Sequence, residues 1–266
     1  MSDVQELLKT ALNAARAAGD ILREMRFQPP QVSEKSHLNL VTDGDYAADE
    51  AIQGVIRAAF PDHLILSEES DLADDIDNWQ PPPGVWWIID PIDGTSNYAR
   101  GLPSWSVSIA AGQGENLLAA AVYDVTRDDM FAAGRGLGAT RNGQPIHTSE
   151  QNELERTMLS ADWAVGEEYR LQIIRLVNVL LPKVRSLRCW GTSALALAHL
   201  AAGYLDCYLH VRLKPWDAAG GVLIVQEAGG TVTTIRGEAW HIRSPSVFAS
   251  NGMLHERLIS MLAPEL

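Results

Sequence analysis

Apolar residues recur along the chain at two different spacings, which predict helices and strands. In residues 4–26 they recur every three or four positions, which predicts a helix with one buried face that ends before Pro29. Short apolar runs, such as Val85 to Ile89, predict buried strands. The same patterns predict further helices at 45–59, 97–100, 167–181, 192–203, 217–228 and 254–262, and strands at 63–66, 105–111, 117–123, 130–133, 157–160, 183–188 and 205–211.

Two polar stretches interrupt these patterns. Residues 31–44 read as a loop or a short hairpin, and residues 71–84, rich in Asp and Pro, read as a surface loop. Predicted helices and strands alternate before and after about residue 150. The expected architecture is therefore a mixed α/β protein, with two tightly joined halves at residues 1–150 and 151–266.

Composition narrows the class of protein. About 46% of the residues are hydrophobic, so a sizeable core is expected. No apolar run approaches the roughly 18 residues of a membrane span, and the first residues lack the basic start and apolar centre of a signal peptide. Cys189 and Cys207 have neither zinc-site nor disulfide-framework spacing. A cytoplasmic protein is expected.

Charge argues against two kinds of partner. With 34 acidic and 21 basic residues the net charge is -13, which disfavours a nucleic acid or an anionic membrane as the main partner. Solubility alone is one explanation of this excess. The other is that bound divalent cations offset acidic side chains locally, at a site that binds an anion.

The turn after the strand at residues 85–89 carries the most informative motif. Asp90 and Asp93 follow the strand three residues apart, and the Ile92 carbonyl lies between them. Carboxylates and carbonyls are the ligands that Mg²⁺ prefers, and the amides of Gly94 and Thr95 lie where a helix begins and where phosphate binds readily. The alternative is that both aspartates only cap a turn and a helix.

Three further acidic positions lie at the ends of predicted elements. Glu68 and Glu69 end a strand, and adjacent residues there point to opposite faces, so one of them can face a cleft. Asp217 precedes a helix of small residues, and Asp45 opens a helix. A solvated charge run or a helix cap explains each position alone. Together they predict a cation site built from Glu68, Asp90, Asp93 and Asp217.

Two segments carry a family resemblance. Trp87 to Tyr98 matches the first signature of the inositol monophosphatase family throughout, and Trp216 to Gly220 matches the second. Glu68-Glu69-Ser70 resembles a third family segment, with Ser67 in place of its glycine. The resemblance spans nearly the whole chain. It implies the layered α-β-α-β-α sandwich of the sugar-phosphatase type, an α+β or mixed α/β fold.

The resemblance also implies roles for these residues around two or three Mg²⁺ ions. Glu68, Asp90 and the Ile92 carbonyl would hold the first ion, Asp90, Asp93 and Asp217 the second, and a third, weaker ion would lie near Glu68. Thr95, paired with Asp45, would orient and help deprotonate a metal-bound water, while Gly94 and Thr95 bind the phosphate. Lys35 would belong to a mobile metal-binding loop. Most of the ligands lie in residues 1–150, and Asp217 with the substrate-contacting loops lies in residues 151–266.

Other residues would select the substrate. By the same resemblance, Asp93, Gly191 and Thr192 would contact substrate hydroxyl groups. Inositol-specific members of the family place a glutamate seven residues before the last metal aspartate, and here that residue is His210. Histidine can still bond a hydroxyl group. Arg212 and Lys214, beside His210, would favour a second phosphate or simply offset the acidic cluster.

The function expected from the sequence is Mg²⁺-dependent hydrolysis of a small phosphate monoester, with inositol 1-phosphate as the first candidate. Other substrates of the family are alternatives: 3'-phosphoadenosine 5'-phosphate, fructose 1,6-bisphosphate, NADP and histidinol phosphate. A non-catalytic, metal-binding regulator on the same fold is a further alternative. Inhibition by lithium and a homodimer are expected by analogy with the family.

Overall fold

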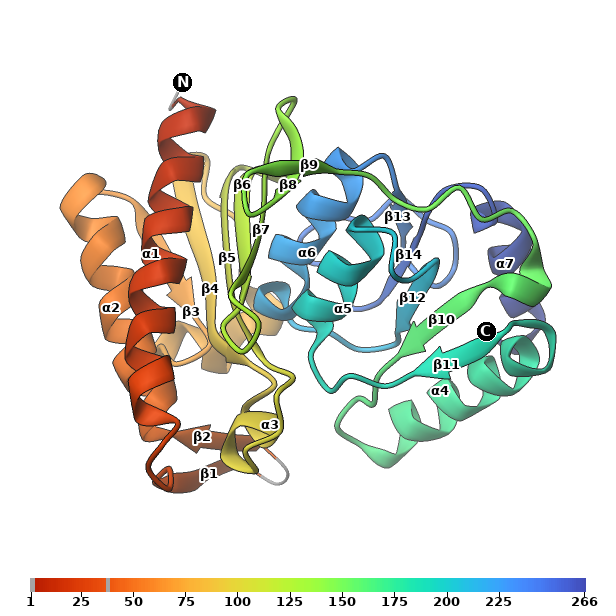
Figure 1. The fold of residues 1–266 in the computed structure, drawn as a ribbon, viewed down its shortest axis with the longest axis horizontal. Coiled ribbons are helices and arrows are strands. Elements are labelled where there is room, and N and C mark those ends of the chain that lie inside the picture. Colours follow the sequence, from red (N-terminus) through yellow and green to blue (C-terminus); the bar gives the residue numbers. More distant parts are fainter. Residues whose placement is uncertain (1–2, 37–38) are drawn as a thin grey trace.

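The described part of the chain has two large β-sheets, with helices between them and outside them, and one small two-stranded sheet (Figure 1). The structure is a computed structural model that describes residues 3–36 and 39–266, without the side chains of residues 35, 36, 39, 71, 72 and 74. The larger sheet takes its strands from residues 64–146 and the smaller from residues 158–250. Helices of the second half pack against both sheets, so one core joins the two predicted halves. The division into halves at residue 150 stays a prediction.

The larger sheet has seven strands that follow one another in chain order. They are β3 (Leu64–Ser67), β4 (Val85–Asp93), β5 (Ser106–Gln113), β6 (Asn116–Asp124), β7 (Asp129–Gly134), β8 (Gly138–Arg141) and β9 (Gln144–Ile146). Neighbours pair antiparallel, except that β3 and β4 are parallel. Strand β4 is buried from Trp86 to Asp93, because helices cover both faces of the sheet.

Helices α1 (Val4–Met25) and α2 (Asp43–Ala59) cover the outer face of this sheet (Figure 1). The start of α1 is stabilised by Asp3, whose carboxylate accepts a hydrogen bond from the Gln5 amide at 2.9 Å. Its buried stripe repeats every three or four residues, as predicted: Leu7, Ala11, Ala14, Ala15, Ala18 and Leu22.

The smaller sheet has the strand order β11-β10-β12-β14-β13. Its strands are β10 (Met158–Ala161), β11 (Ser186–Arg188), β12 (Cys207–His210), β13 (Thr231–Thr233) and β14 (Val247–Ser250). Strand β10 is parallel to both β11 and β12, while β14 pairs antiparallel with β12 and β13. The carboxyl ends of β10 and β12 therefore lie next to each other.

Helices α5 (Ser193–Ala201) and α6 (Pro215–Glu227) fill the space between the sheets (Figure 1). Every residue of α5 is buried, which explains why its sequence is almost uniformly apolar. Helices α4 (Glu167–Leu180) and α7 (His255–Leu262) cover the far face of the smaller sheet. The order of layers is helix, sheet, helix, sheet, helix, so the predicted α-β-α-β-α sandwich is confirmed.

Shorter elements complete the fold. The polar segment at 31–44 forms a hairpin of β1 (Val32–Ser36) and β2 (Asn39–Thr42), the second of the two predicted possibilities. Helix α3 (Thr95–Ala99) follows β4. The short 3₁₀ helices are η1 (Asp71–Asn78), η2 (Leu154–Arg156), η3 (Leu181–Lys183) and η4 (Ala263–Glu265).

Several predicted boundaries are wrong. Helix α2 begins at Asp43, not Asp45, because Thr42 caps it: its amide and hydroxyl donate to Asp45 at 2.7 and 2.6 Å. Helix α6 begins at Pro215, since proline fits the first turn of a helix. The predicted surface loop at 71–84 contains η1. Strands β13 and β14 were not predicted, because three or four residues carry too little periodicity.

Candidate active site

A β-bulge at the end of β4 brings Asp90 and Asp93 to the same face of the larger sheet. Asp90 pairs with Ser108 and Asp93 with Ser106. A spacing of three residues on β4 therefore lies opposite a spacing of two residues on β5. Residues two apart on a strand share a face, and paired residues do too, so both aspartates point toward α5 and α6. Without the extra residue, side chains three positions apart would point to opposite faces.

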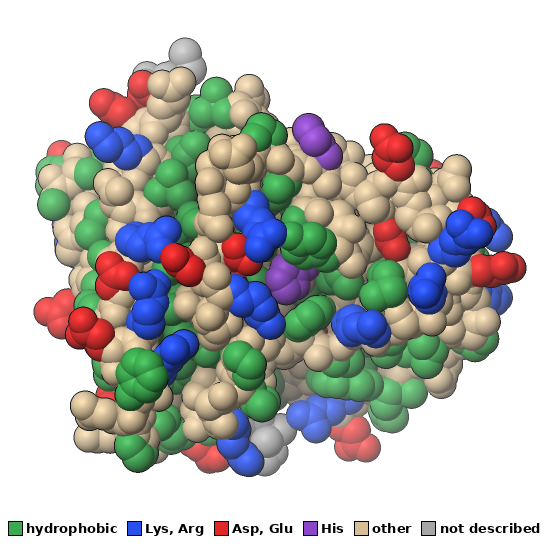
Figure 2. Space-filling model, viewed as in Figure 1, with side chains coloured by type: hydrophobic (Ala, Val, Ile, Leu, Met, Phe, Trp, Pro, Cys, Tyr) green, Lys and Arg blue, Asp and Glu red, His purple; other side chains and the backbone are tan. Residues whose placement is uncertain are grey.

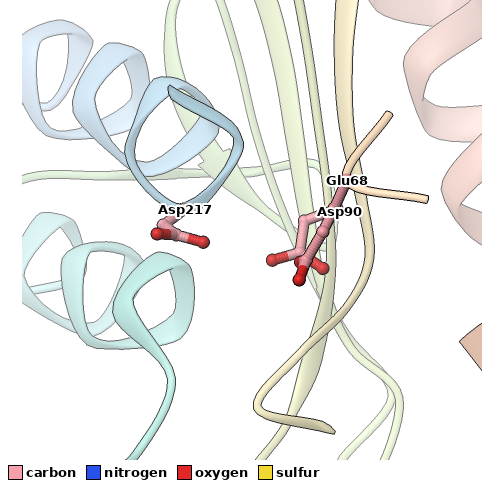
Figure 3. A group of neighbouring side chains, drawn as sticks. All are labelled: Glu68, Asp90 and Asp217. Atoms are coloured by element: carbon pink, nitrogen blue, oxygen red, sulfur yellow. The ribbon is translucent and has the colours of Figure 1, made fainter. Parts of the chain in front are cut away.

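Glu68 and Asp217 approach Asp90 from two other elements. Glu68 continues β3, and its amide bonds to the Ile89 carbonyl at 3.1 Å. Asp217 is the third residue of α6, where its carboxylate accepts a hydrogen bond from the Lys214 amide at 2.8 Å. One oxygen from each of Glu68, Asp90 and Asp217 lies within 4.8 Å of the others. Figure 3 shows Asp217 facing Glu68 and Asp90 across the space between α6 and β4.

The acidic side chains in this cluster hold protons more tightly than ordinary carboxyl groups. Burial raises the pKa of Asp90 well above its usual value, and the charges of Glu68, Asp93 and Asp217 raise it further. Burial and the charge of Asp93 raise the pKa of Asp217 to about 7. Like charges this close disfavour full ionisation. A divalent cation would remove the repulsion, and carboxylate oxygens are the ligands that Mg²⁺ and Ca²⁺ prefer, so the residues fit a metal site.

Asp93 lies beside this group and is held by the start of α5. The Thr192 hydroxyl donates to its carboxylate, as do the amides of Ser193 at 3.2 Å and Ala194 at 2.8 Å. Burial raises the pKa of Asp93 to about 6, and these three hydrogen bonds limit the rise. Asp93 thus joins the acidic end of β4 to the middle helical layer.

Thr95 and Asp45, predicted as a pair, are in contact. The Thr95 hydroxyl lies 3.2 Å from an Asp45 carboxylate oxygen and 3.0 Å from the Ile92 carbonyl, and a single hydroxyl proton serves one of these acceptors at a time. The second oxygen of Asp45 accepts both hydrogen bonds from Thr42. Asp45 is therefore fixed in place behind Thr95.

Gly94 makes the turn between β4 and α3 possible. Its φ of 97° lies in the region that favours glycine. A Cβ atom there would lie 3.1 Å from the Gly191 carbonyl oxygen and 3.2 Å from that of Ser104. The turn that carries Thr95 therefore packs directly against the turn before α5.

A cavity of about 840 Å³ opens beside the cluster. Among its walls are four residues predicted to contact substrate: Asp93, Gly191, Thr192 and His210. His210 is buried, which lowers its pKa to about 4, so its ring is neutral near pH 7. Its Nδ1 atom accepts a hydrogen bond from the Arg212 amide at 3.2 Å.

Arg212 and Lys214 also line this cavity, and both are paired with one acidic side chain. Both lie 3.2 Å from the carboxylate of Asp77, which belongs to η1. Asp77 is 68% exposed, so these are weak ion pairs that a stronger anion can replace. The positive charges of Arg212 and Lys214 therefore offset the negative charge of Asp77. Sequence analysis treated Asp77 only as part of a polar loop.

A family model described as the inositol monophosphatase family matches residues 3–265. The chain belongs to this family. Membership makes the protein a phosphomonoesterase, and it confirms the resemblance found in the sequence. Family members are metal-dependent, and the group of Glu68, Asp90 and Asp217 is close enough to bind a metal ion.

Two relatives and one solved structure match this inositol monophosphatase family member over at least 95% of their own length. "Inositol monophosphatase 1" of Solanum lycopersicum is 37% identical over 264 residues, which cover 97% of this chain and 95% of that protein. "Nus factor SuhB" of Escherichia coli strain K12 is 34% identical over 98% of this chain and 97% of its own. The solved structure of an IMPase from Thermotoga maritima has a TM-score of 0.87 at 30% identity, covering 97% of each chain.

Two further observations bear on partners and location. In residues 3–36 and 39–266, no helix has both the length and the apolar character needed to cross a membrane. On the face shown in Figure 2, Lys and Arg side chains are scattered among acidic and neutral ones.

The side chain of Lys35 lies outside the described residues, so its place in a metal-binding loop stays a prediction.

Sequence analysis missed Asp162, which also lines the cavity. It directly follows β10, is 5% exposed, and accepts a hydrogen bond from the Gly191 amide at 2.8 Å. Burial and the charge of Asp93 raise its pKa to about 7. An acidic residue directly after a short apolar strand is the same signal that pointed to Glu68, but no motif marked it here.

Proposed function

We propose that this phosphomonoesterase is Mg²⁺-dependent and hydrolyses inositol 1-phosphate or a closely related polyol phosphate. The observation that carries the proposal is the meeting of Glu68, Asp90 and Asp217 from three separate elements, with one oxygen of each within 4.8 Å of the others. Asp93 lies next to them at the wall of a cavity large enough for a sugar-sized substrate.

In this proposal, two or three Mg²⁺ ions bind the acidic cluster. Glu68, Asp90 and the Ile92 carbonyl hold the first, Asp90, Asp93 and Asp217 the second, and a third binds weakly near Glu68. Bound Mg²⁺ would neutralise the phosphate and lower the pKa of a bound water. The Ile92 carbonyl can serve as a ligand whether or not it accepts the Thr95 hydrogen bond, because a carbonyl oxygen has two lone pairs.

Thr95 and Asp45 then position the attacking water. When the Thr95 hydroxyl donates to Asp45, its own oxygen is free to accept a hydrogen bond from a water above the phosphate. Asp45 cannot rotate away, because Thr42 binds its other oxygen. The amides of Gly94 and Thr95 bind the phosphate group, as the resemblance implies, while Gly191, Thr192 and His210 contact the leaving group.

Release of inorganic phosphate from a panel of monoesters tests the proposal. The panel contains inositol 1-phosphate, 3'-phosphoadenosine 5'-phosphate, fructose 1,6-bisphosphate, NADP and histidinol phosphate, each with Mg²⁺ and with a chelator. We expect the highest kcat/KM on inositol 1-phosphate, and none with the chelator. Asp217→Asn should abolish turnover, whereas Asp62→Asn, an exposed aspartate outside the cluster, should not. A clear preference for another ester would replace the substrate assignment.

A metal-binding regulator is the second candidate function, favoured by the similarity to a protein named Nus factor SuhB. The complete set of Glu68, Asp90, Asp93, Thr95 and Asp217 speaks for catalysis, because a non-catalytic copy would be free to lose some of its members. Purified protein that binds Mg²⁺ but hydrolyses no small phosphate ester would favour the regulator.

Three further properties are proposed from the family resemblance. The enzyme is inhibited by millimolar lithium, because Li⁺ competes for a weakly held Mg²⁺ position. It forms a homodimer and acts in the cytoplasm. Phosphate release at increasing LiCl, with KCl as the ionic-strength control, tests the first property, and sedimentation equilibrium tests the second.

A further inference from the structure

Asp162 is a buried carboxylate with one oxygen that lacks a hydrogen-bond donor. Its Oδ1 atom accepts from the Gly191 amide at 2.8 Å. Its Oδ2 atom exposes less than 1 Å² and has no hydrogen-bond partner within the described part of the chain. Buried polar atoms in native proteins are nearly always paired, because an unpaired one costs about 1–3 kcal/mol. A missing donor on a cavity-lining residue points to a ligand.

The neighbour of Asp162 on the next strand is His210. Strands β10 and β12 lie next to each other (Figure 1) and run parallel. Ala161 pairs with Leu209, so Asp162 and His210 are the next pair in register. Paired residues of parallel strands point to the same face, and both side chains line the cavity beside the acidic cluster. The carboxyl ends of parallel strands are where ligands of α/β proteins bind.

His210 supplies the complementary hydrogen-bonding group. Its Nδ1 atom accepts a hydrogen bond from the Arg212 amide, so a neutral ring carries its proton on Nε2. This tautomer is assigned from the hydrogen bond. Burial keeps the ring neutral near pH 7. The pair therefore offers one acceptor, on Asp162, and one donor, on His210.

We propose that Asp162 accepts a hydrogen bond from a hydroxyl group of the leaving group, next to the hydroxyl group to which His210 donates in the proposed function. A hydroxyl group donates and accepts at once, so adjacent hydroxyl groups of a polyol satisfy both residues. This assignment rests on the proposed function and deepens it. It places a carboxylate on β10 that selects polyol phosphates over esters whose leaving group has no hydroxyl group.

A structural role is the competing explanation. Through the Gly191 amide, Asp162 also supports the turn whose next residues hold Asp93. Loss of that support would displace Asp93, Gly191 and Thr192, which contact substrate hydroxyl groups by the family resemblance, so truncation of Asp162 alone does not separate the explanations. Asp162→Asn separates them, because it keeps an oxygen for the Gly191 amide and changes only the other position of the carboxylate. A structural role predicts that this variant resembles the wild type, whereas a hydroxyl contact predicts a selective loss on esters that carry the hydroxyl group.

The experiment compares kcat/KM for inositol 1-phosphate and for p-nitrophenyl phosphate, with Mg²⁺, in the wild type, Asp162→Ala and Asp162→Asn. Asp162→Asn keeps an oxygen for the Gly191 amide, removes the charge and replaces the acceptor Oδ2 by an NH₂ group, which only donates. Because a site built to bond a hydroxyl group discriminates strongly, we expect Asp162→Ala to lower the ratio of the two values by about 10- to 100-fold. Asp162→Asn should lower the ratio too, by a smaller factor, because its NH₂ group can still bond a hydroxyl oxygen. An unchanged ratio in Asp162→Asn or in Asp162→Ala would overturn the inference.

A binding measurement separates this inference from the proposed function. Saturation-transfer NMR detects free inositol bound to the Mg²⁺-loaded protein at millimolar concentration, whether or not the protein hydrolyses any ester. We expect a signal with the wild type and its loss in Asp162→Ala and His210→Phe. No signal with the wild type would overturn the hydroxyl assignment, even if the protein proves to be an active phosphatase.

Discussion

Single residues of the active site are tuned by burial and by one another. Asp90, Asp93 and Asp217 all have a pKa above the usual value, with burial as the first cause in each case. Raised values mean that the folded protein binds protons that the unfolded chain releases. The metal-free protein therefore loses stability as pH rises, from near the ordinary value of 3.8 through about 6 for Asp93 and about 7 for Asp217.

Magnesium should reverse this pH dependence. Because Mg²⁺ binds the deprotonated carboxylates, the rise in Tm on adding it should be larger at pH 8 than at pH 5. Thermal unfolding at these two pH values, each with Mg²⁺ and with a chelator, measures the rise in Tm. Asp217→Asn should reduce both the pH dependence and the effect of Mg²⁺. An equal rise in Tm at both pH values would contradict the raised pKa values.

Thr95 permits a test of the hydroxyl group alone. Thr95→Val keeps the shape of the side chain and removes the hydroxyl that bonds Asp45, so we expect kcat to fall by about 100-fold, with a smaller change in KM. Thr95→Ser keeps the hydroxyl and should retain most of the activity. Steady-state kinetics on inositol 1-phosphate measures both. A kcat for Thr95→Val close to that of Thr95→Ser would argue against the assigned role.

At the scale of elements, turns and strand ends create the site. The apolar strand at 85–89 was predicted from the sequence, because its pattern is local. The residues after it were predicted to form a turn, which is wrong as far as Asp93, because β4 continues to that residue. The bulge that turns Asp90 and Asp93 to one face was not predicted either, since it exists only in the pairing of β4 with β5. Similarly, Asp45 reads as a helix cap alone and becomes a partner of Thr95 only when α2 packs beside β4.

Gly94 tests how tightly the turn is constrained. Gly94→Ala places a methyl group against two carbonyl oxygens at a positive φ, so we expect a loss of about 2–3 kcal/mol in the free energy of unfolding, and a loss of activity. Gly101→Ala is the matched control: its φ is 70° and no atom lies within 4 Å of the added Cβ. It should cost about 1 kcal/mol. Urea unfolding measures both, and equal losses would mean that contacts at Gly94 are unimportant.

At the scale of the whole molecule, the middle layer joins the two sheets and completes the site. Helix α6 supplies Asp217, and the start of α5 holds Asp93, so the acidic cluster exists only when both helices pack against the larger sheet. Gly220 and Gly221 permit this approach. A Cβ on Gly220 would lie 2.8 Å from the Ser108 hydroxyl, and one on Gly221 would lie 2.5 Å from the Leu197 Cβ.

Gly221→Ala should therefore weaken the whole fold. Alanine favours a helix by about 1 kcal/mol over glycine, but pressing α5 away from α6 costs about 1–3 kcal/mol, so we expect a net loss of stability. Gly54→Ala, in the exposed part of α2 with nothing within 4 Å, should gain about 0.5–1 kcal/mol. Urea unfolding compares the two variants. A gain in both would show that the middle layer tolerates a methyl group.

The sequence by itself determined the kinds of elements, the family and the acidic residues of the cluster, because these depend on local periodicity and on short motifs such as Trp87 to Tyr98. Tertiary structure decided which acidic oxygens meet, through the bulge in β4 and the packing of α6. It also decided that Asp162 faces the cavity, beside His210. Contacts between residues far apart in the chain are set by packing, and no pattern within a single segment records them.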